Sequence, residues 1–405
     1  MQNNNETKPP IMNANLEKIG TDTVKALNEA KQQVTIIDDS TNGLASGAIT
    51  GISGSSGVFK FAYINLGTSV KQALEESGAN YCIKLSTEGE QQVISITSKD
   101  HAANDSKAIL EYQFTGSQQD IAEKTVCTAL ACMNHRVTNP DMSTENRLKV
   151  YQAIADSQNV VMYKSHSFEN QAAAEMKQKL AEQGLTIATV ESITCGLAGR
   201  ALGAAKTYGT YSNHAKNQHV GVNQDTMDDY HEVSVHTAEE MAIGGLKKSG
   251  NDICMSFTGF AGEAWIENKK FKINAYETEE QKQNRKNSAM PAPKYIEHGQ
   301  VCIAVAYKDN ETNTVRCKII KEQFGKDSNF NDRHAIRDAV ITRGAALVGE
   351  VYQNVLQEKG VERKRSNSVS HKAPKSLDSN LNRIDPKKNW RESVLSKNQA
   401  SAINR

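Results

Sequence analysis

The sequence has almost no excess charge of either sign. Its 48 Lys and Arg residues stand against 47 Asp and Glu residues, for a formal net charge of +1. Proteins that bind nucleic acid through its phosphates carry a basic surplus, so this balance argues against a general nucleic-acid binder. No apolar run approaches bilayer-spanning length, and the polar N-terminus has no apolar signal core. We expect a cytoplasmic protein without a membrane span, and export that needs no signal peptide stays open.

Paired cysteines are also missing. None of the seven cysteines lies in a C-x-x-C pair, and their odd number and irregular spacing favour reduced core thiols over a disulfide or zinc framework. The spacing of His214, His219, His231 and His236 suits no common metal site, and we expect these histidines on the surface. The sequence therefore indicates neither a metal nor a cofactor.

Two parts of the chain repeat one another. Residues 26–49 match residues 179–202 at a constant offset of 153. A second block, 74–85, matches 246–257 at an offset of 172. Such a repeat predicts an internal duplication, and 405 residues are enough for two domains that each bury a core.

The repeat sets the predicted domain order. We expect a disordered leader (1–12), a degenerate first domain (13–135), a connector (136–167), a second domain (168–357) with an insertion at 264–298, and a disordered basic tail (358–405). Residues 361–405 hold eleven Lys and Arg against four Asp and Glu, with almost no apolar periodicity, which is typical of disorder. A docking or targeting tail that binds a protein partner is the alternative for this segment.

Apolar patterning predicts an α/β fold. Strands are expected at 34–37, 81–86, 93–97, 109–114, 185–190, 252–257, 301–307 and 315–324, and helices at 13–32, 115–130, 143–156, 168–183, 236–249 and about 332–357. In each copy the first strand runs into a glycine-containing turn and then into a helix of small residues. This layout is the usual way for an α/β protein to present backbone N–H groups to a ligand.

Hydroxyl, lysine and arginine side chains recur at strand ends of the second copy. The candidates are Ser192, Thr194 and Gly196 after one strand, Tyr211 and Lys216 in a polar patch, Thr258 and Gly259 after another strand, and Arg333 or Arg337 in the last helix. A hydroxyl nucleophile beside a lysine whose pKa is lowered makes a workable hydrolase pair, and an arginine would hold a phosphate.

In their order along the chain, these motifs resemble a known family. They are L-T-I-A-T-V-E-S-I-T-C-G-L-A, T-Y-S-N-H-A-K, H-E-V-S-V-H-T-A-E-E-M-A, T-G-F-A-G, G-Q-V-C-I-A-V-A and N-D-R-H-A-I-R, and together they resemble the CinA C-terminal domain, the nicotinamide-mononucleotide deamidase (PncC) family. The resemblance covers 168–357, with a degenerate version at about 13–135. It implies an α/β/α sandwich, usually a homodimer. It also implies cleavage of the carboxamide of nicotinamide mononucleotide to the nicotinate nucleotide and ammonia, without a metal.

The resemblance also implies a set of site residues. The second copy keeps Glu191, Ser192, Thr194, Gly196, Tyr211, Ser212, Asn213, Lys216, Ser234, Thr258, Gly259, Gly262 and Arg333. The expected catalytic residues are Ser192, Tyr211 and Lys216 of this set, together with Ser56 of the first copy. The expected substrate-binding residues are Thr194, Gly196, Asn213, Ser234, Thr258, Gly259 and Arg333.

The second copy departs from the family pattern in three places. The family's E-S-C-T-G-G is changed at Ile193 and Cys195, and a side chain at 195 would block an approach that glycine permits. The loop after T-G-x-A-G is replaced by Glu263 and the insertion. The family's P-G-S-S-A-V-F segment, which we take to hold the nucleophilic serine, is missing between Ala201 and Tyr211.

The first copy keeps that segment as S-G-S-S-G-V-F (53–59) but has lost other parts of the pattern. Asp38 and Asp39 replace the Glu-Ser pair, and Gln118 stands where the second copy has its arginine. A less favoured alignment would place Lys71 at the lysine position.

Two interpretations follow. The first is a pseudo-dimeric amidohydrolase, to which the first copy lends Ser55 or Ser56. We expect that Ser56 reaches across the interface, or that Ser192 acts as the nucleophile with Lys216 as its base. The second is a degenerate nucleotide-binding or interaction protein that keeps the fold without catalysis. An exported protein that acts by binding, and a further oligomer, also stay open.

Overall fold

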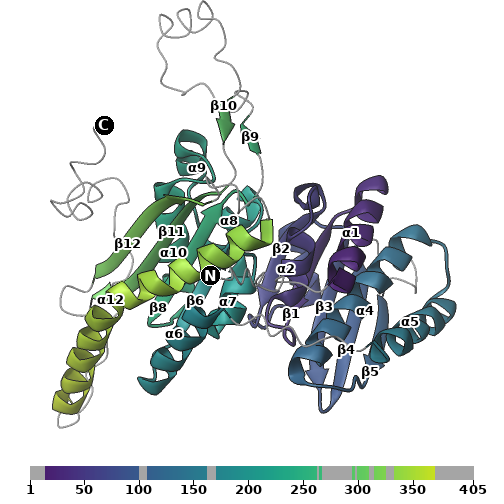
Figure 1. The fold of residues 1–405 in the computed structure, drawn as a ribbon, viewed down its shortest axis with the longest axis horizontal. Coiled ribbons are helices and arrows are strands. Elements are labelled where there is room, and N and C mark those ends of the chain that lie inside the picture. Colours follow the sequence, from purple (N-terminus) through teal and green to yellow (C-terminus); the bar gives the residue numbers. More distant parts are fainter. Residues whose placement is uncertain are drawn as a thin grey trace, which may run out of the picture.

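One ten-stranded sheet runs through both halves of the chain, in the order β12-β11-β8-β6-β7-β2-β1-β3-β4-β5 (Figure 1). The computed structural model describes residues 14–99, 107–161, 170–261, 264–266, 294–296, 299–309, 314–324 and 333–369. The expected leader and most of the expected insertion and tail lie outside these residues. The architecture is mixed α/β, as predicted.

The first half contributes five strands to this sheet. Its elements are α1 (Ala14–Glu29), β1 (Val34–Asp38), α2 (Leu44–Thr50), the 3-10 turn η1 (Ser55–Gly57), β2 (Phe59–Ile64), α3 (Val70–Ser77), β3 (Tyr81–Glu88), β4 (Gln91–Ser98), β5 (Lys107–Tyr112), α4 (Gln118–Thr138) and α5 (Thr144–Asn159). Helix α4 begins at a capping box, because the Ser117 Oγ accepts from Asp120 N–H and the Asp120 carboxylate accepts from Ser117 N–H.

The second half contributes the other five strands. Its elements are α6 (Gln171–Glu182), β6 (Ile187–Glu191), α7 (Leu197–Leu202), β7 (Lys206–Gly209), α8 (Asn213–Val220), α9 (Gln224–Tyr230), α10 (Val235–Ser249), β8 (Ile253–Gly259), β9 (Ala264–Ile266), β10 (Lys294–Ile296), β11 (Gln300–Asp309), β12 (Thr314–Gln323) and α12 (Arg333–Val369). Strands β9 and β10 form a separate antiparallel pair within the expected insertion. Helix α12 continues past residue 357, where the sequence pattern ends it.

The halves repeat one strand order. Strand β1 is parallel to β2 and β3, and β6 is parallel to β7 and β8. Outward from β3 and from β8, antiparallel strands complete each half. From the centre, the orders are β2-β1-β3-β4-β5 and β7-β6-β8-β11-β12. We infer from this repetition that the duplication seen in the sequence extends to the fold.

Strands β2 and β7 join the halves by antiparallel pairing, which we call the seam. Tyr63 lies opposite Tyr208, flanked by the pairs Ala62–Gly209 and Ile64–Thr207. Glycine is required at 209, since a Cβ there would lie 2.4 Å from the Ala62 Cβ. Neither seam strand was predicted from the sequence.

Helices cover both faces of the sheet. On strand β6, Ile187 faces one apolar core, whereas Ala188 and Val190 face another, as the alternation of a strand dictates. The first core is covered by helices such as α1, α4, α6 and α12, and the second by α8 and α10. All seven cysteines are free and six are buried, which confirms the expected core thiols. No helix in the described ranges is long and apolar enough to cross a membrane.

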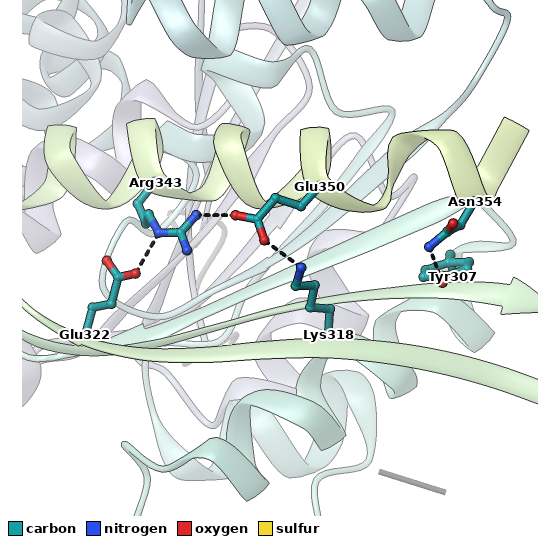
Figure 2. A network of polar contacts seen from close by, with 6 residues as sticks. All are labelled: Tyr307, Lys318, Glu322, Arg343, Glu350 and Asn354. Atoms are coloured by element: carbon teal, nitrogen blue, oxygen red, sulfur yellow. Dashed lines mark hydrogen bonds and ion pairs between the residues drawn. The ribbon is translucent and has the colours of Figure 1, made fainter. Parts of the chain in front are cut away.

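An ion-pair network holds α12 against β12 (Figure 2). Arg343 bonds Glu322 at 2.6 Å and Glu350 at 2.9 Å, and Lys318 bonds Glu350 at 2.6 Å. These side chains are partly exposed, so each pair contributes about 0–1 kcal/mol. The network connects α12 to the edge strand β12.

Candidate composite site at the seam

A serine of the first half contacts a tyrosine of the second half. The Ser55 Oγ lies 3.1 Å from the Tyr211 hydroxyl, and the Phe59 ring meets the Tyr211 ring edge-on at 5.9 Å. Ser55 is 1 % exposed because η1 turns it inward, whereas the neighbouring Ser56 is exposed. Ser55, rather than Ser56, is therefore the first-half serine that meets the tyrosine.

Lys216 lies on the helix that follows Tyr211. The Ser212 Oγ caps α8 by accepting from Ala215 N–H at 3.1 Å, and this start directs Lys216 into the interior. Lys216 is 1 % exposed, and its Nζ donates to Asn213 Oδ1 at 3.4 Å. Its positive charge acts on the Cys195 thiol. Ser55 and Tyr211 together are called the composite site below.

A carboxylate occupies the N-terminus of α7. Glu191 is fully buried and accepts from the N–H groups of Gly196, Ala198 and Gly199 at 2.7, 3.1 and 2.7 Å. This is a favourable place for a negative charge, because the first N–H groups of a helix have no partner within it. The N–H of Gly196, an expected substrate contact, thus has a protein partner.

Asp38 has the same role in the first half. Its carboxylate accepts from Thr41 N–H at 2.6 Å and from Gly43 N–H at 2.8 Å. The sequence repeat aligns Asp38 with Glu191 at the offset of 153, so the replacement of Glu by Asp keeps the anion at the helix start. The replacement of the glutamate by aspartate in the first copy therefore preserves this structural role.

Cys195 is held in a strained conformation in the turn between β6 and α7. Its φ is +40°, a region that costs a side-chain-bearing residue about 1–2 kcal/mol. Burial raises the pKa of the Cys195 thiol to about 12, and Glu191 adds to this effect. The thiol is therefore protonated at neutral pH and is a poor nucleophile. Next to it, the fully buried Thr194 Oγ1 has no hydrogen-bond partner among the described residues.

The two arginines expected near the ligand differ in their surroundings. Arg337 is fully buried and donates to Gly47 O at 3.1 Å, to Thr50 Oγ1 at 3.0 Å and to Thr194 O at 2.9 Å. Burial lowers the pKa of Arg337 to about 10, so the group stays charged at neutral pH. Arg333, one turn earlier at the start of α12, is only half-buried. Arg333 is thus the more accessible of the two arginines.

The hydroxyls of Thr258 and Ser234 bond backbone groups, and Ser192 bonds β8 through its backbone N–H. Thr258 Oγ1 donates to Glu232 O at 2.5 Å, and Ser234 Oγ caps α10 by accepting from Thr237 N–H at 3.1 Å. Ser192 is 8 % exposed, and its N–H donates to Phe257 O at 2.8 Å. At Gly259, a Cβ would lie 2.8 Å from Gln300 O, so glycine there allows two strands to pair closely.

The surface assignment of the histidines was wrong for His219. This side chain is 4 % exposed, and its ring lies 4.5 Å from Phe61 and 4.6 Å from Tyr63. Burial lowers the pKa of His219 to about 3, helped by the positive charges of Lys248 and His214. The ring is therefore neutral and packs beside the seam. The sequence could have indicated this burial, because His219 follows the buried Lys216 by three residues on α8. Residues three apart lie on the same face of a helix.

Comparisons with known proteins point to one family. Residues 169–271 match the CinA C-terminal domain. CinA-like proteins of Chloroherpeton thalassium and Kosmotoga olearia are 44 % and 42 % identical over 91 residues, which are 20 % of this chain and 22 % of each relative. The chain thus spans about a fifth of the length of the curated relatives it matches.

Two solved structures are also similar to part of this chain. The competence/damage inducible protein CihA from Agrobacterium tumefaciens has 22 % identity and a TM-score of 0.34, and covers 45 % of this chain and 94 % of its own. A CinA superfamily protein from Klebsiella pneumoniae has 20 % identity and a TM-score of 0.32, covering 46 % and 98 %. By its sequence, the second half of the chain carries a CinA C-terminal domain over residues 169–271.

Proposed function

We propose that the chain is an amidohydrolase of the nicotinamide-mononucleotide deamidase type, whose catalytic site is made jointly by its two halves. The observation that carries this proposal is the 3.1 Å contact between Ser55 Oγ and the Tyr211 hydroxyl across the seam. Each half alone lacks a part of the family pattern, and the contact pairs a serine of the first half with a tyrosine of the second.

The seam also supports a pseudo-dimer. The family resemblance implies a homodimer, and here the equivalent tyrosines Tyr63 and Tyr208 lie opposite each other between two halves of the same strand order. On this proposal, the first half stands in for the second subunit. The deletion in one half is then tolerated because the other half supplies the missing serine.

The proposed reaction is acyl transfer through Ser55. The Ser55 Oγ attacks the carboxamide carbon, and its proton passes to the Tyr211 oxygen as the phenolic proton moves on toward the leaving nitrogen. The C–N bond breaks and ammonia departs, leaving an ester on Ser55. Water then hydrolyses the ester to the nicotinate nucleotide and restores the serine. Lys216, buried near the start of α8, provides the positive charge of the serine/tyrosine/lysine cluster that the resemblance implies.

Arg333 is the proposed contact for the substrate phosphate. It begins α12, it is half-buried, and its positive charge is near enough to act on Arg337. A guanidinium at a helix start combines its own charge with the N–H groups of the first turn, which suits an anion.

Nucleotide binding without hydrolysis is the second candidate function. The observation that favours it is Cys195, whose side chain stands where the resemblance implies a glycine and is fully buried. A site narrowed in this way would hold the nucleotide without admitting the carboxamide to Ser55.

Ammonia release from nicotinamide mononucleotide by the purified chain separates these functions. We expect release by the parent and a loss of about 100-fold or more in Ser55→Ala and Tyr211→Phe, the scale of acid–base and nucleophilic contributions. Ser53→Ala, in the same exposed segment, is the matched control and should match the parent.

Ser56→Ala tests the neighbouring serine directly. Retained release in Ser56→Ala with loss in Ser55→Ala identifies Ser55, whereas the reverse result would transfer the role to Ser56. If the parent binds the nucleotide in calorimetry and releases no ammonia, the second candidate function is the correct one.

A further inference from the structure

The segment that supplies Ser55 also carries a buried phenylalanine, Phe59. Ser55 lies in η1 and is 1 % exposed, and Phe59 begins β2 and is fully buried. The Val58 N–H donates to Ser55 O at 3.1 Å, and the Val34 N–H donates to Val58 O at 2.8 Å. These two bonds close the turn and tie its end to β1. The serine and the phenylalanine are therefore held in fixed positions relative to each other.

The seam brings Tyr211 to this segment. Ala62 of β2 pairs with Gly209 of β7, and Tyr211 follows two residues after that glycine. Beyond the paired residues, the Ser212 Oγ donates to Lys60 O at 3.5 Å. The chain around Tyr211 thus continues alongside the start of β2.

The ring of Tyr211 needs a further contact to fix its orientation. Tyr211 is half-buried, and each staggered rotamer of its side chain would carry the hydroxyl to a different place. The Phe59 ring meets the Tyr211 ring edge-on, with centroids 5.9 Å apart and an interplanar angle of 68°. Aromatic pairs prefer this geometry, because the positive edge of one ring faces the negative face of the other. The contact therefore favours one orientation of the tyrosine ring.

A bulge in β2 turns Phe59 toward Tyr211. Strand β2 has one extra residue between its pairings with Val34 and Ile36 of β1. Residues two apart in a regular strand point to the same face. Here Phe59 belongs to the first core, against which Tyr211 packs, whereas Phe61 belongs to another cluster of buried residues. Bulges often re-aim side chains next to active sites, and this one directs the ring to the tyrosine.

One segment of the first half thus contacts both ends of the tyrosine side chain. Phe59 contacts the ring of Tyr211, and the Ser55 Oγ lies 3.1 Å from its hydroxyl. The corresponding connection in the second half, residues 203–205, contains neither a serine nor a phenylalanine. The first half therefore supplies the ring that orients the tyrosine as well as the serine that meets it.

We infer that Phe59 is a positioning residue, whose ring fixes the Tyr211 hydroxyl against the Ser55 Oγ. As an effect on catalysis, this inference rests on the proposed function. Phe59 acts through Tyr211, so its loss should lower kcat, which depends on the alignment of the two hydroxyls. It should leave KM nearly unchanged, because the proposed phosphate contact is Arg333.

A double-mutant cycle separates this role from a general loss of stability. Phe59→Leu keeps an apolar side chain without the ring. Its kcat for ammonia release from nicotinamide mononucleotide should fall about 10-fold or more, with KM within about twofold of the parent. In a Tyr211→Phe background, Phe59→Leu should change kcat by less than about twofold, because the hydroxyl that it positions is absent. Equal losses in both backgrounds would overturn the inference, as would a parent-like kcat in Phe59→Leu.

Phe61→Leu is the matched control. It makes the same change in the same strand, at a fully buried ring that belongs to the other cluster. Both leucine variants should lower the melting temperature, and only Phe59→Leu should lower kcat. An equal loss of kcat in Phe61→Leu would overturn the inference, because the effect would then belong to the strand rather than to the ring beside Tyr211.

A measurement without substrate tests the inference even if the chain releases no ammonia. In the full chain labelled with 3-fluorotyrosine, the fluorine signal that is missing from Tyr211→Phe belongs to Tyr211. This signal should be single and narrow in the parent and in Phe61→Leu. It should broaden or split in Phe59→Leu, because the ring then takes more than one orientation. A signal that stays single and equally narrow overturns the inference, whereas a broadened signal in a chain that releases no ammonia rejects only the proposed function.

Discussion

Gly43 and Gly196, which align in the sequence repeat, touch each other where the halves meet. A Cβ built on Gly43 would lie 2.7 Å from the Gly196 Cα, and the reverse distance is 2.8 Å. Both residues also have positive φ, +90° and +104°. The glycine at 196 therefore allows two turns of the same chain to approach each other closely.

Gly196→Ala should destabilise the protein by about 2–5 kcal/mol, because a clash with backbone adds to the cost of a positive φ. Gly78→Ala is the matched control. It has a φ of +66° and nothing within 4 Å of the added Cβ, so it should lose only about 1 kcal/mol. Urea denaturation measures both, and equal losses would contradict the contact between the glycines.

His219→Phe should make stability less sensitive to acid. The pKa of His219 is lowered from 6.5 to about 3 in the folded state, so between these values the unfolded chain binds a proton that the folded chain does not. Stability therefore falls as the pH drops from 6.5 toward 3, by about 2–3 kcal/mol at pH 4.5.

Phenylalanine at 219 keeps a ring beside Phe61 and Tyr63 and cannot titrate. Denaturation at pH 7 and pH 4.5 should show a smaller difference for His219→Phe than for the parent. The exposed His236 is the control, and His236→Phe should keep the parent's pH dependence. If the stability of His219→Phe falls with pH as steeply as that of the parent, His219 does not cause the pH dependence.

Arg337→Met should cost about 3 kcal/mol or more. Three hydrogen bonds from a buried cation are lost, and the carbonyls of Gly47 and Thr194 remain buried without this donor. Arg343→Ala breaks the partly exposed network of Figure 2 and should cost about 1 kcal/mol or less. Chemical denaturation of both variants gives the comparison, and a small loss in Arg337→Met would contradict its role between the halves.

Arg333→Ala should weaken binding of nicotinamide mononucleotide by about 1.5–3 kcal/mol, the usual contribution of a charged hydrogen bond, without changing the melting temperature. Calorimetry measures the affinity. Binding equal to that of the parent would exclude a phosphate contact by this arginine.

Much of each half follows from local patterns in the sequence. The strands at β1, β6, β8 and β11 are short buried apolar runs bounded by turns, and they were predicted within a few residues. The seam strands β2 and β7 were not predicted. Strand β7 is only four residues long, and its partner lies far away in the sequence, so no local pattern marks it.

The candidate site likewise has features that the sequence predicts and features that it does not. The sequence by itself determined the chemistry that is present: a serine segment in one half, and a tyrosine, a lysine and an arginine in the other. These depend on residue type and order, which a repeat and a family pattern display directly.

Only the tertiary structure decided which of these groups meet. It selected Ser55 over Ser56, because the 3-10 turn η1 buries one hydroxyl and exposes the next. It also buried Arg337 fully and left Arg333 only half-buried, although they lie one helical turn apart. Both choices depend on how the halves pack across the seam, and contacts between residues distant in sequence determine that packing.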